Sequence, residues 1–326
     1  MKYKILYVIN PNIKQLIFGL LCFCMTNLTL YGQTTLISPT GAGGFELGNT
    51  FAANGWTATT GTATQNQWVC STGATAGFSG TNSAYISNNT ASVPPAYAFT
   101  INAARVSHLY RNFTVPAGET IINLSFSWIS NGDAGRDKMR VYLIPAATTP
   151  VYGTALAAAG VAPTGIVQLG ANYSGQTTWT TANLTVPAAY AGTTCRLVFE
   201  WSNNNNGGTQ PPAAVDNISL TSAAPAPILG DECATAIPLT VNSSCSYTTY
   251  TNAANTPSTS VPDPGCASYS NGNDIWFSAV VPFTGILTVD TQTGVITDGG
   301  MAFYTGSCGA LTLLQCDDDS SANGLM

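Results

Sequence analysis

The sequence predicts an all-β protein, and three observations support this fold class. Only 7% of its 326 residues are charged, against roughly a quarter in an average globular protein. Gly (32) and Pro (18) are frequent, and no window places apolar residues at a helical period over four turns. Short alternating segments between turn-forming residues are typical of packed sheets. We therefore expect a β-sandwich followed by a second, incomplete β-sandwich.

The first 32 residues are typical of an export signal. Three lysines precede an apolar run at residues 16–25, and a run of this length is too short to span a bilayer. Gly32 supplies a small residue at which cleavage can follow. We expect residues 1–32 to be a signal peptide, the mature chain to have no transmembrane segment, and the protein to be secreted or exposed at the cell surface.

Strand signals recur through the first part of the mature chain. Residues 120–129 alternate between polar and apolar side chains, which is typical of a half-buried strand. Residues 139–144, 196–201 and 214–220 carry comparable patterns, and clusters of Asn, Gly and Pro separate them. The pattern predicts one domain over residues 35–222.

A second group of strand signals follows an uncharged Pro/Ala linker at residues 223–229. Residues 275–281, 285–291 and 301–304 are each apolar or alternating. They predict a second sandwich at residues 230–326. No closing strand follows the acidic turn near the end of the sequence, so we expect this domain to be truncated.

Charge and composition exclude several classes of function. Beyond the predicted signal peptide, six basic residues face 15 acidic ones, and no Lys or Arg follows Ala223. Nucleic-acid binding is excluded because it requires a basic patch that neutralises phosphates. The sequence has one histidine, His108, and no G-x-S-x-G motif, so we expect no catalytic residues. The acidic excess fits solubility, and cation binding is the alternative.

Five cysteines of the second half are candidates for disulfides in an oxidising compartment. The spacing of Cys308 and Cys316 predicts a disulfide that joins the two strands of a hairpin. Cys233 and Cys245 are the next local pair, which leaves Cys266 without a partner. In the first half, two further cysteines either pair with each other or remain buried thiols, and their Cα separation decides between these alternatives. They are Cys70 and Cys195.

An ordered set of short motifs runs through residues 44–221. Its members are Gly44-Phe45-Glu46, Gly55-Trp56, Gln67-Trp68, Leu124-Ser125-Phe126, Trp179 with Leu184, Ala191-Gly192 and Val215-Asp216-Asn217-Ile218-Ser219-Leu220. In this order the set resembles the cleaved-adhesin, or choice-of-anchor J, family of bacterial surface proteins. Those domains are related in form to MAM domains and to calcium-binding carbohydrate-binding modules. The resemblance implies a jelly-roll sandwich.

The same resemblance implies a structural calcium ion. In such jelly rolls an early Glu and a late Asp, together with backbone carbonyls, tie the first and last strands to one ion. Here the matching carboxylates are Glu46 and Asp216, and the backbone at Gly48 or Asn49 can supply carbonyl oxygens. Calcium takes six to eight oxygen ligands. The alternative is that Asp216 only caps a turn while Glu46 is solvated.

The second half contains five further motifs. They are Gly230-Asp231-Glu232-Cys233-Ala234-Thr235-Ala236, Asn273-Asp274-Ile275-Trp276-Phe277, Phe283-Thr284-Gly285 to Val289, Ala302-Phe303-Tyr304-Thr305-Gly306-Ser307-Cys308 and Cys316-Asp317-Asp318-Asp319. Together they resemble the PPC, or pre-peptidase C-terminal, kind of β-sandwich. Members of that family usually accompany another functional domain and assist it. The three adjacent aspartates either help to bind a cation or form a solvated turn.

Aromatic and amide side chains are the remaining candidates for ligand binding. Most of the six tryptophans are expected in the core. Trp68 or Trp179, if placed on a loop, would stack on a sugar ring. The polar loop that contains Asn204 and Asn205 can present amides to a ligand, or it is simply mobile.

These observations favour a secreted or cell-surface, non-catalytic binding or adhesion protein of bacterial type with calcium-stabilised modules. Its partner would be an extracellular protein or a polysaccharide. A sorting tail downstream would indicate type IX secretion. The alternative is a carbohydrate-binding accessory region of a larger secreted hydrolase or peptidase. The sequence does not identify the ligand.

Overall fold

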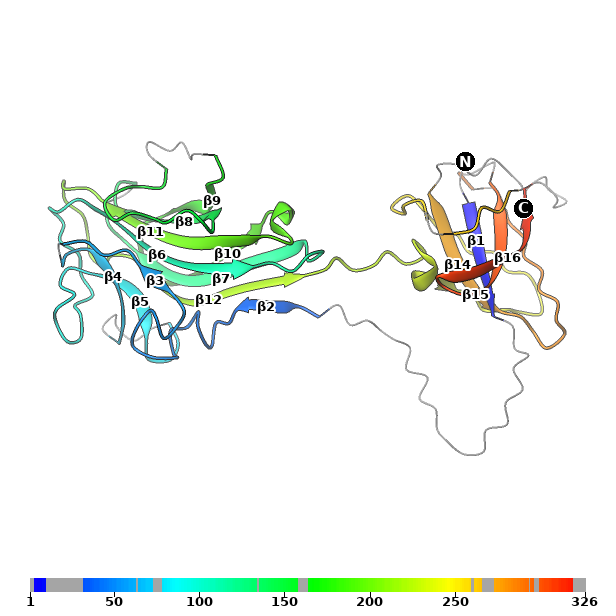
Figure 1. Cartoon of the computed structure of the whole chain (residues 1–326), viewed down its shortest axis with the longest axis horizontal. Coiled ribbons are helices and arrows are strands. Elements are labelled where there is room, and N and C mark those ends of the chain that lie inside the picture. Colours follow the sequence, from blue (N-terminus) through cyan, green and yellow to red (C-terminus); the bar gives the residue numbers. More distant parts are fainter. Residues whose placement is uncertain are drawn as a thin grey trace, which may run out of the picture. The chain divides into compact units, whose positions relative to one another are not determined.

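The computed structural model describes residues 3–9, 32–62, 64–72, 78–133, 135–157, 164–258, 261–265, 273–292, 294–295 and 299–318. Within these ranges the protein is built from strands and two short 3-10 turns, so the predicted all-β class is confirmed (Figure 1). The chain divides into two compact units. The first domain is Thr29–Pro225, and the second is Met1–Leu28 together with Ala226–Met326. The break falls inside the expected Pro/Ala linker.

Two antiparallel sheets form the first domain. The strands of one sheet are β2 (Thr34–Ile37), β4 (Gln67–Ser71), β5 (Ser83–Ser87), β7 (Ile121–Ser130), β10 (Gln176–Val186) and β12 (Ala214–Ala223). Their order is β10-β7-β12-β5-β4, with β2 paired to β12. The strands of the other sheet are β3 (Thr57–Ala58), β6 (Arg105–Thr114), β8 (Lys138–Pro145), β9 (Val167–Tyr173) and β11 (Thr194–Asn203). Their order is β3-β6-β11-β8-β9. The two sheets lie face to face in Figure 1.

The core of the first domain lies between these sheets. The expected strand at residues 120–129 is confirmed as β7, where Ile122, Leu124 and Phe126 are buried. The ring of Phe126 meets that of Phe199 on β11 edge to face, with centroids 5.1 Å apart. Because successive residues of a strand point to opposite faces, this alternation fixes which side of β7 faces the core. Each fully buried side chain of this size contributes about 1.5–3 kcal/mol.

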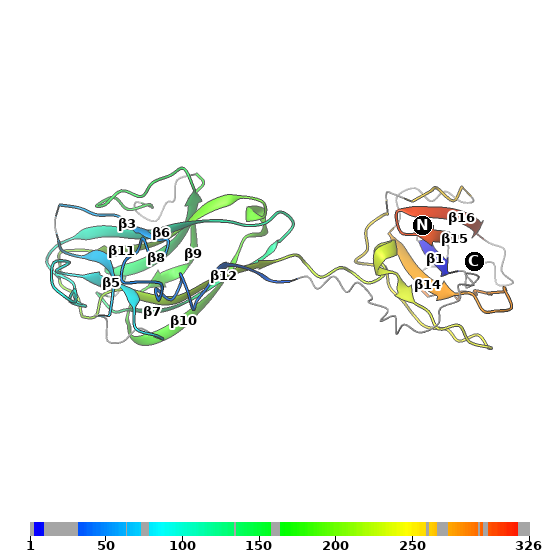
Figure 2. The same cartoon turned by 60° about the horizontal axis from the view of Figure 1, so that its bottom comes forward.

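One five-stranded sheet forms the second domain. Its strands are β1 (Tyr3–Ile9), β13 (Ile237–Pro238), β14 (Asp274–Val280), β15 (Met301–Ser307) and β16 (Ala310–Asp317). Their order is β13-β14-β1-β15-β16, and β1 runs parallel to both of its neighbours (Figure 2). Part of the expected signal peptide therefore forms a strand here. The rest of that segment, residues 10–31, lies outside the described residues.

The expected strand at residues 285–291 is wrong, because these residues are described without strand pairing. Leu287 and Val289 instead pack against the cluster formed by Ile275, Phe277 and Ala279. The two edges of β14 are already occupied by β13 and β1. The apolar residues of this alternating segment therefore pack against the sheet without forming a strand of it.

The expected cysteine pairs of the second domain are corrected by the structure. Cys233 is bonded to Cys308, with Cα atoms 5.7 Å apart. Cys308 lies in the turn between β15 and β16, whereas Cys316 lies opposite Ala302 and is itself disulfide-bonded. A residue in the turn cannot reach the far end of its own hairpin. Cys245 is a free, exposed thiol.

The two cysteines of the first domain are buried thiols. Cys70 and Cys195 are both free, which decides between the alternatives that the sequence left open. Burial raises the pKa of both, to about 12 for Cys70. These side chains therefore behave as small apolar groups rather than as reactive thiolates. Cys266 lies outside the described residues.

Candidate functional site

A close approach of two chain segments brings Glu46 next to Asp216. The turn after β2 crosses β12 at a bulge, where Asn217 has a positive φ of 49°. Gly43 accepts a hydrogen bond from Ile218 N at 2.9 Å, and a Cβ atom on Gly43 would lie 1.8 Å from Ile218 O. Only glycine permits this approach. The turn then continues directly to Glu46.

The segment at residues 78–82 bridges the two carboxylates. Glu46 Oε1 accepts hydrogen bonds from Thr81 N and Asn82 N, each at 2.8 Å. Asp216 Oδ2 accepts a hydrogen bond from Ser79 N at 3.1 Å. Both predicted calcium ligands therefore contact one short segment, although they are 170 positions apart in the sequence numbering.

The two carboxylates differ in their surroundings. Asp216 is fully buried, and burial together with the negative charge of Glu46 raises its pKa to about 6. Glu46 is exposed, and its slight desolvation acts to raise its pKa. The hydrogen bonds that it accepts from Asn82 and Thr81 together outweigh this effect, so the pKa of Glu46 is lowered. Gly48 O already accepts hydrogen bonds from Asn54 Nδ2 at 2.7 Å and from Cys70 Sγ at 3.7 Å. Asn49 is exposed.

No group of three or more His, Cys, Asp and Glu side chains gathers as a metal site among the described residues. An ion at Glu46 and Asp216 would therefore depend on backbone oxygens and water for its other ligands. Calcium accepts such mixed oxygen sets, whereas zinc prefers nitrogen and sulfur. The chemistry of this pair fits calcium.

A cavity of about 360 Å³ opens where β6 begins and β11 ends. Its polar lining consists of Thr62, Arg105, Tyr152 and Asn203. Tyr152 is half-buried, and its hydroxyl donates a hydrogen bond to Gln65 O at 3.3 Å. The cavity combines a cation, a phenol ring and amide groups. We call it the loop-end pocket.

Two buried asparagines make the floor of the loop-end pocket rigid. Asn66 is fully buried, and its Nδ2 donates to Asn203 Oδ1 at 3.1 Å. Asn66 Oδ1 accepts a hydrogen bond from Thr100 N, and Asn203 Nδ2 donates to Ala103 O. Asn66 has a positive φ of 53°, a conformation that Asn tolerates better than most residues. Sequence reasoning placed Asn203 in the polar loop but missed Asn66, at which only the turn-forming character of Asn hinted.

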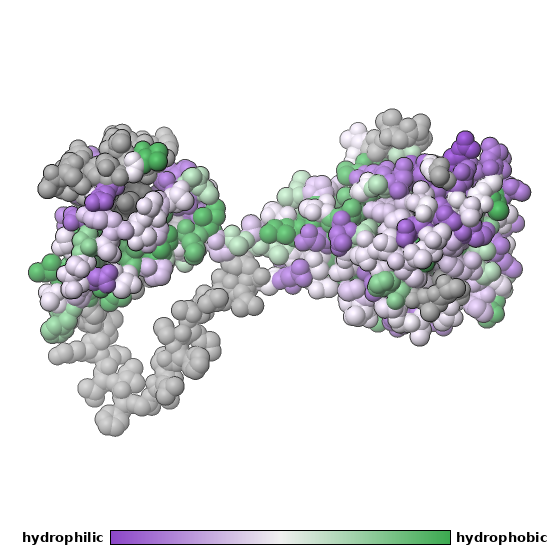
Figure 3. Space-filling model, turned by 180° about the vertical axis from the view of Figure 1, so that it is seen from behind, coloured by the Kyte–Doolittle hydropathy of each residue, from purple (hydrophilic) through white to green (hydrophobic). Residues whose placement is uncertain are grey.

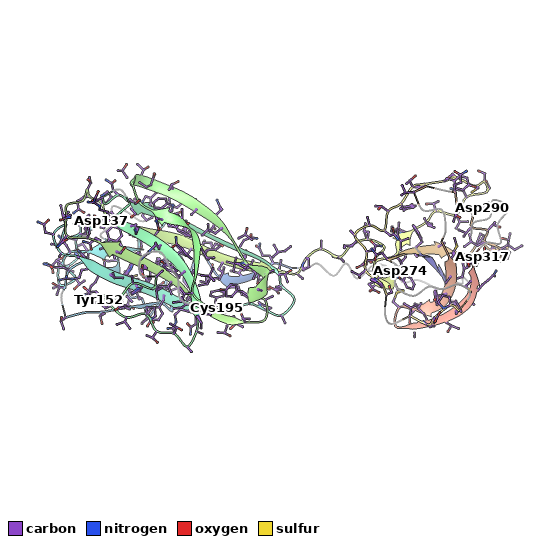
Figure 4. All side chains as sticks on the ribbon, turned by 90° about the horizontal axis from the view of Figure 1, so that it is seen from above. Asp137, Tyr152, Cys195, Asp274, Asp290 and Asp317 are labelled. Atoms are coloured by element: carbon purple, nitrogen blue, oxygen red, sulfur yellow. A yellow bond between two sulfur atoms is a disulfide. The ribbon has the colours of Figure 1, made fainter. Side chains whose placement is uncertain are left out.

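The predicted amide loop lies beside this pocket and is anchored by a buried carboxylate. Asp137 is fully buried, and its Oδ1 accepts a hydrogen bond from Asn204 N at 2.9 Å. The side-chain oxygen of Asn204 accepts from Asn206 N, while Asn205 is exposed. Asp137 and Tyr152 lie toward the same end of the first domain in Figure 4. A role of Asn204 and Asn205 in ligand binding stays a prediction.

The two predicted tryptophans differ in their surroundings. Trp68 is 4% exposed, and its indole N–H donates to Ser107 O at 3.2 Å. The expectation that Trp68 stacks on a sugar is wrong, because an inward position on β4 places the ring in the core. Trp179 on β10 is half-buried and meets the exposed ring of Phe78, with centroids 6.1 Å apart. Its role in binding stays a prediction.

A second, smaller hollow of about 250 Å³ lies over β7, β10 and β12. Its side chains are short and uncharged, and they include Asn123, Ser125, Asn183, Thr185, Ser219 and Thr221. We call it the polar groove. Pale and purple shades also dominate the visible face of the first domain in Figure 3. The groove has no charged or aromatic lining residue.

The single histidine belongs to a sealed ion-pair cluster. Glu200 on β11 accepts hydrogen bonds from His108 Nε2 at 3.1 Å and from Leu156 N at 2.6 Å, and it pairs with Arg140. His108 and Glu200 are fully buried. Burial would raise the pKa of Glu200, but these hydrogen bonds and charges outweigh it and lower the pKa. The cluster is out of reach of a substrate and stabilises the outer face of its sheet.

Comparisons with known proteins concern the two domains separately. Residues 229–325 match the family model GBD_T9SS_assoc, described as galactose binding domain-like. No curated protein matches the chain. Among the described residues, no helix has the length and apolar character needed to cross a membrane. The fold defines an all-β protein, in which a domain of two packed sheets is followed by a domain with one five-stranded sheet.

Several solved structures are similar at low identity. The CBM22-1 xylan-binding domain of Paenibacillus barcinonensis Xyn10C is 14% identical, covers 60% of this chain and 98% of its own, and has a TM-score of 0.34. TmCBM61, solved with β-1,4-galactotriose, is 11% identical over 56% of this chain and 97% of its own, with a TM-score of 0.33. A cyclase from Fischerella sp. TAU is 17% identical over 60% of this chain and 100% of its own, with a TM-score of 0.37. Similarity at this level does not indicate a function.

Proposed function

We propose that the chain is a secreted or cell-surface protein whose first domain binds a polysaccharide without catalysis. The loop-end pocket carries this proposal. It places the guanidinium of Arg105 and the ring of Tyr152 in one hollow, whose lining residue Asn203 is fixed by internal hydrogen bonds, and sugar sites commonly combine a ring surface with a few fixed polar groups. The match of residues 229–325 to a galactose-binding-like family associated with T9SS supports an extracellular location.

Adhesion is the biological role that we propose for this binding. The alternative is an accessory region that holds a larger secreted hydrolase or peptidase near its substrate. Both roles use the same pocket, so they differ in the protein's context rather than in its binding chemistry. A full-length gene with a catalytic domain would favour the accessory role.

Binding of the full chain to a panel of soluble polysaccharides, measured by calorimetry, tests the proposal. Tyr152→Ala removes the ring of the loop-end pocket, and we expect affinity to fall at least tenfold, about 1.4 kcal/mol. Asn183→Ala is the matched control in the polar groove and should leave affinity unchanged. Loss of binding only in Asn183→Ala would move the site to the groove. No binding to any polysaccharide would refute the proposed function.

We also propose that one calcium ion stabilises the first domain. Glu46 and Asp216 would hold it, and a backbone carbonyl at Gly48 or Asn49 would add a ligand. Such an ion supplies positive charge between two carboxylates that otherwise repel each other. It would tie β12 to the turn after β2, and its role would be structural.

Thermal unfolding of the full chain with calcium and with chelator tests this ion. A ligand that binds only the folded state stabilises it by about 2.7 kcal/mol at a hundredfold excess over Kd. We expect the shift to vanish in Glu46→Gln and Asp216→Asn. Asp133→Asn, an acid outside the pair, is the control and should retain the shift. If the wild-type protein unfolds at the same temperature with calcium and with chelator, the calcium proposal is wrong.

A further inference from the structure

The loop-end pocket contains a cation that no carboxylate neutralises. Arg105 is the only charged residue in its lining. The guanidinium donates a hydrogen bond to Ala104 O at 2.7 Å, which is a neutral acceptor. Within the described part of the chain, no Asp or Glu lies within ion-pair distance of Arg105. Its positive charge is therefore available to a ligand in the pocket.

Most other arginines of the first domain are committed elsewhere. Arg140 pairs with the buried Glu200, and Arg136 pairs with Asp133 at 3.6 Å. Arg111 donates to Asn54 O at 2.6 Å. Arg196 lies over the ring of Tyr110, with 4.6 Å from Cζ to the centroid, and donates to a backbone carbonyl. Arg105 differs from these because it lines a cavity.

Tyr152 complements this cation. Burial raises the pKa of its hydroxyl, and the charge of Arg105 together with a hydrogen bond from this side chain offsets that effect only in part. Gly153 N donates to Val106 O at 2.9 Å, which fastens the loop that carries Tyr152 to β6. A Cβ atom on Gly61 would lie 2.2 Å from the Tyr152 ring, so this glycine permits the ring to pack closely. The ring is thereby held in a fixed position beside the guanidinium.

We propose that the loop-end pocket selects an anionic sugar residue, whose acidic group pairs with Arg105 while its ring packs near Tyr152. The inference rests on the proposed polysaccharide binding and adds the charge class of the sugar. A planar guanidinium matches a carboxylate in a bidentate pair, and such charge-assisted hydrogen bonds are about twice as strong as neutral ones. A uronic-acid carboxylate and a sulfate ester share this chemistry.

Non-specific electrostatic attraction to the whole protein would not produce a preference for acidic sugars. The chain has nine basic and 15 acidic residues and a formal net charge of -6, so its overall field repels polyanions. Preference for an acidic sugar would therefore require a local cationic site. This makes the comparison of charged and neutral ligands informative.

The test compares three oligosaccharides on the full chain by calorimetry in the presence of chelator. They are an oligogalacturonide, its fully methyl-esterified form, and a sulfated galactan fragment of similar length. We expect at least tenfold tighter binding of an anionic ligand than of the neutral ester. The carboxylated and sulfated ligands distinguish the two sources of negative charge.

Arg105→Gln should abolish this preference while weak binding of the neutral ester remains. Arg105→Lys should keep part of it, since the charge stays but the bidentate geometry is lost. Arg136→Gln, an exposed cation of the same domain, is the matched control and should behave as wild type. Unchanged unfolding temperatures would show that the variants fold.

The outcomes separate this inference from the proposed function. Equal binding of neutral and acidic ligands, or a preference that survives Arg105→Gln, would overturn the anionic selectivity and leave polysaccharide binding in place. No binding of any saccharide would overturn both. A preference that is lost in Arg105→Gln, reduced in Arg105→Lys and unchanged in Arg136→Gln would support both.

Discussion

The two domains of this chain reach a folded structure by different means. The first encloses one large core between two sheets, and its buried rings include Phe126, Phe199 and Trp201. The second has one five-stranded sheet with small apolar clusters, and a disulfide joins Cys233 to Cys308. A domain that buries little apolar surface needs a covalent constraint more than a domain with a large core does.

Their buried polar groups differ as well. The first domain buries an ion-pair cluster around Glu200. The second has no Lys or Arg in residues 226–326, and it relies on neutral anchors such as Asn255. The Nδ2 atom of Asn255 donates to Gly230 O at 3.0 Å and to Asp274 O at 2.7 Å. The second domain also buries the carboxylate of Asp274, but this group accepts its hydrogen bonds from the neutral donors Ser258 N and Trp276 Nε1.

Core truncation should give the largest effect and test the contrast in packing. Phe199→Ala should lower the free energy of unfolding of the first domain by about 3–5 kcal/mol, because its ring is fully buried. Phe277→Ala should cost the second domain less, about 2–3 kcal/mol, since its partner Tyr250 is partly exposed. Denaturant unfolding that resolves two transitions measures both. Equal losses would show that the two cores are equally tight.

Removing the disulfide should affect the second domain alone. Cys233→Ser with Cys308→Ser opens a 75-residue connection and should cost about 2–4 kcal/mol. Cys245→Ser is the matched control, because this thiol is free and exposed, and should change stability by less than about 0.5 kcal/mol. The same denaturant curves provide the readout. A shift in the first-domain transition would contradict the independence of the two domains.

Acid should weaken the first domain through Glu200. Its pKa is lowered in the folded state, so the unfolded chain binds a proton first as the pH falls, and stability is lost through the folded-state pKa. We expect Glu200 to account for about 1–3 kcal/mol of the loss between pH 6 and pH 2. The pH dependence of unfolding should flatten in Glu200→Gln. If stability falls with pH in this variant as steeply as in the wild-type protein, other carboxylates cause the acid sensitivity.

Salt should produce the smallest effect and sharpen the charge contrast. Residues 226–326 carry nine acidic and no basic residues, so screening reduces their mutual repulsion. We expect the second-domain transition to gain about 0.3–1 kcal/mol between 0.05 and 0.5 M sodium chloride. The first-domain transition should move less, since its ion pair at Glu200 is buried. Destabilisation of the second domain by salt would contradict this account.

Local sequence patterns predicted some features well. The alternation at residues 120–129 became β7 with the expected buried face, because side-chain direction along a strand depends only on position parity. The same alternation wrongly predicted a strand at residues 285–291, because both edges of the neighbouring β14 are already paired with β13 and β1. Trp68 was misjudged because residue type alone does not reveal which face of a short strand points inward.

The sequence by itself determined the all-β class, the strands with clear alternation and the absence of basic residues from residues 226–326, because each depends on composition or on neighbours along the chain. Tertiary structure decided that Cys233 pairs with Cys308, that Glu46 approaches Asp216, and that Arg105 shares a cavity with Tyr152. These contacts join residues far apart in sequence. They depend on the path of the chain through both sheets, which no local pattern specifies.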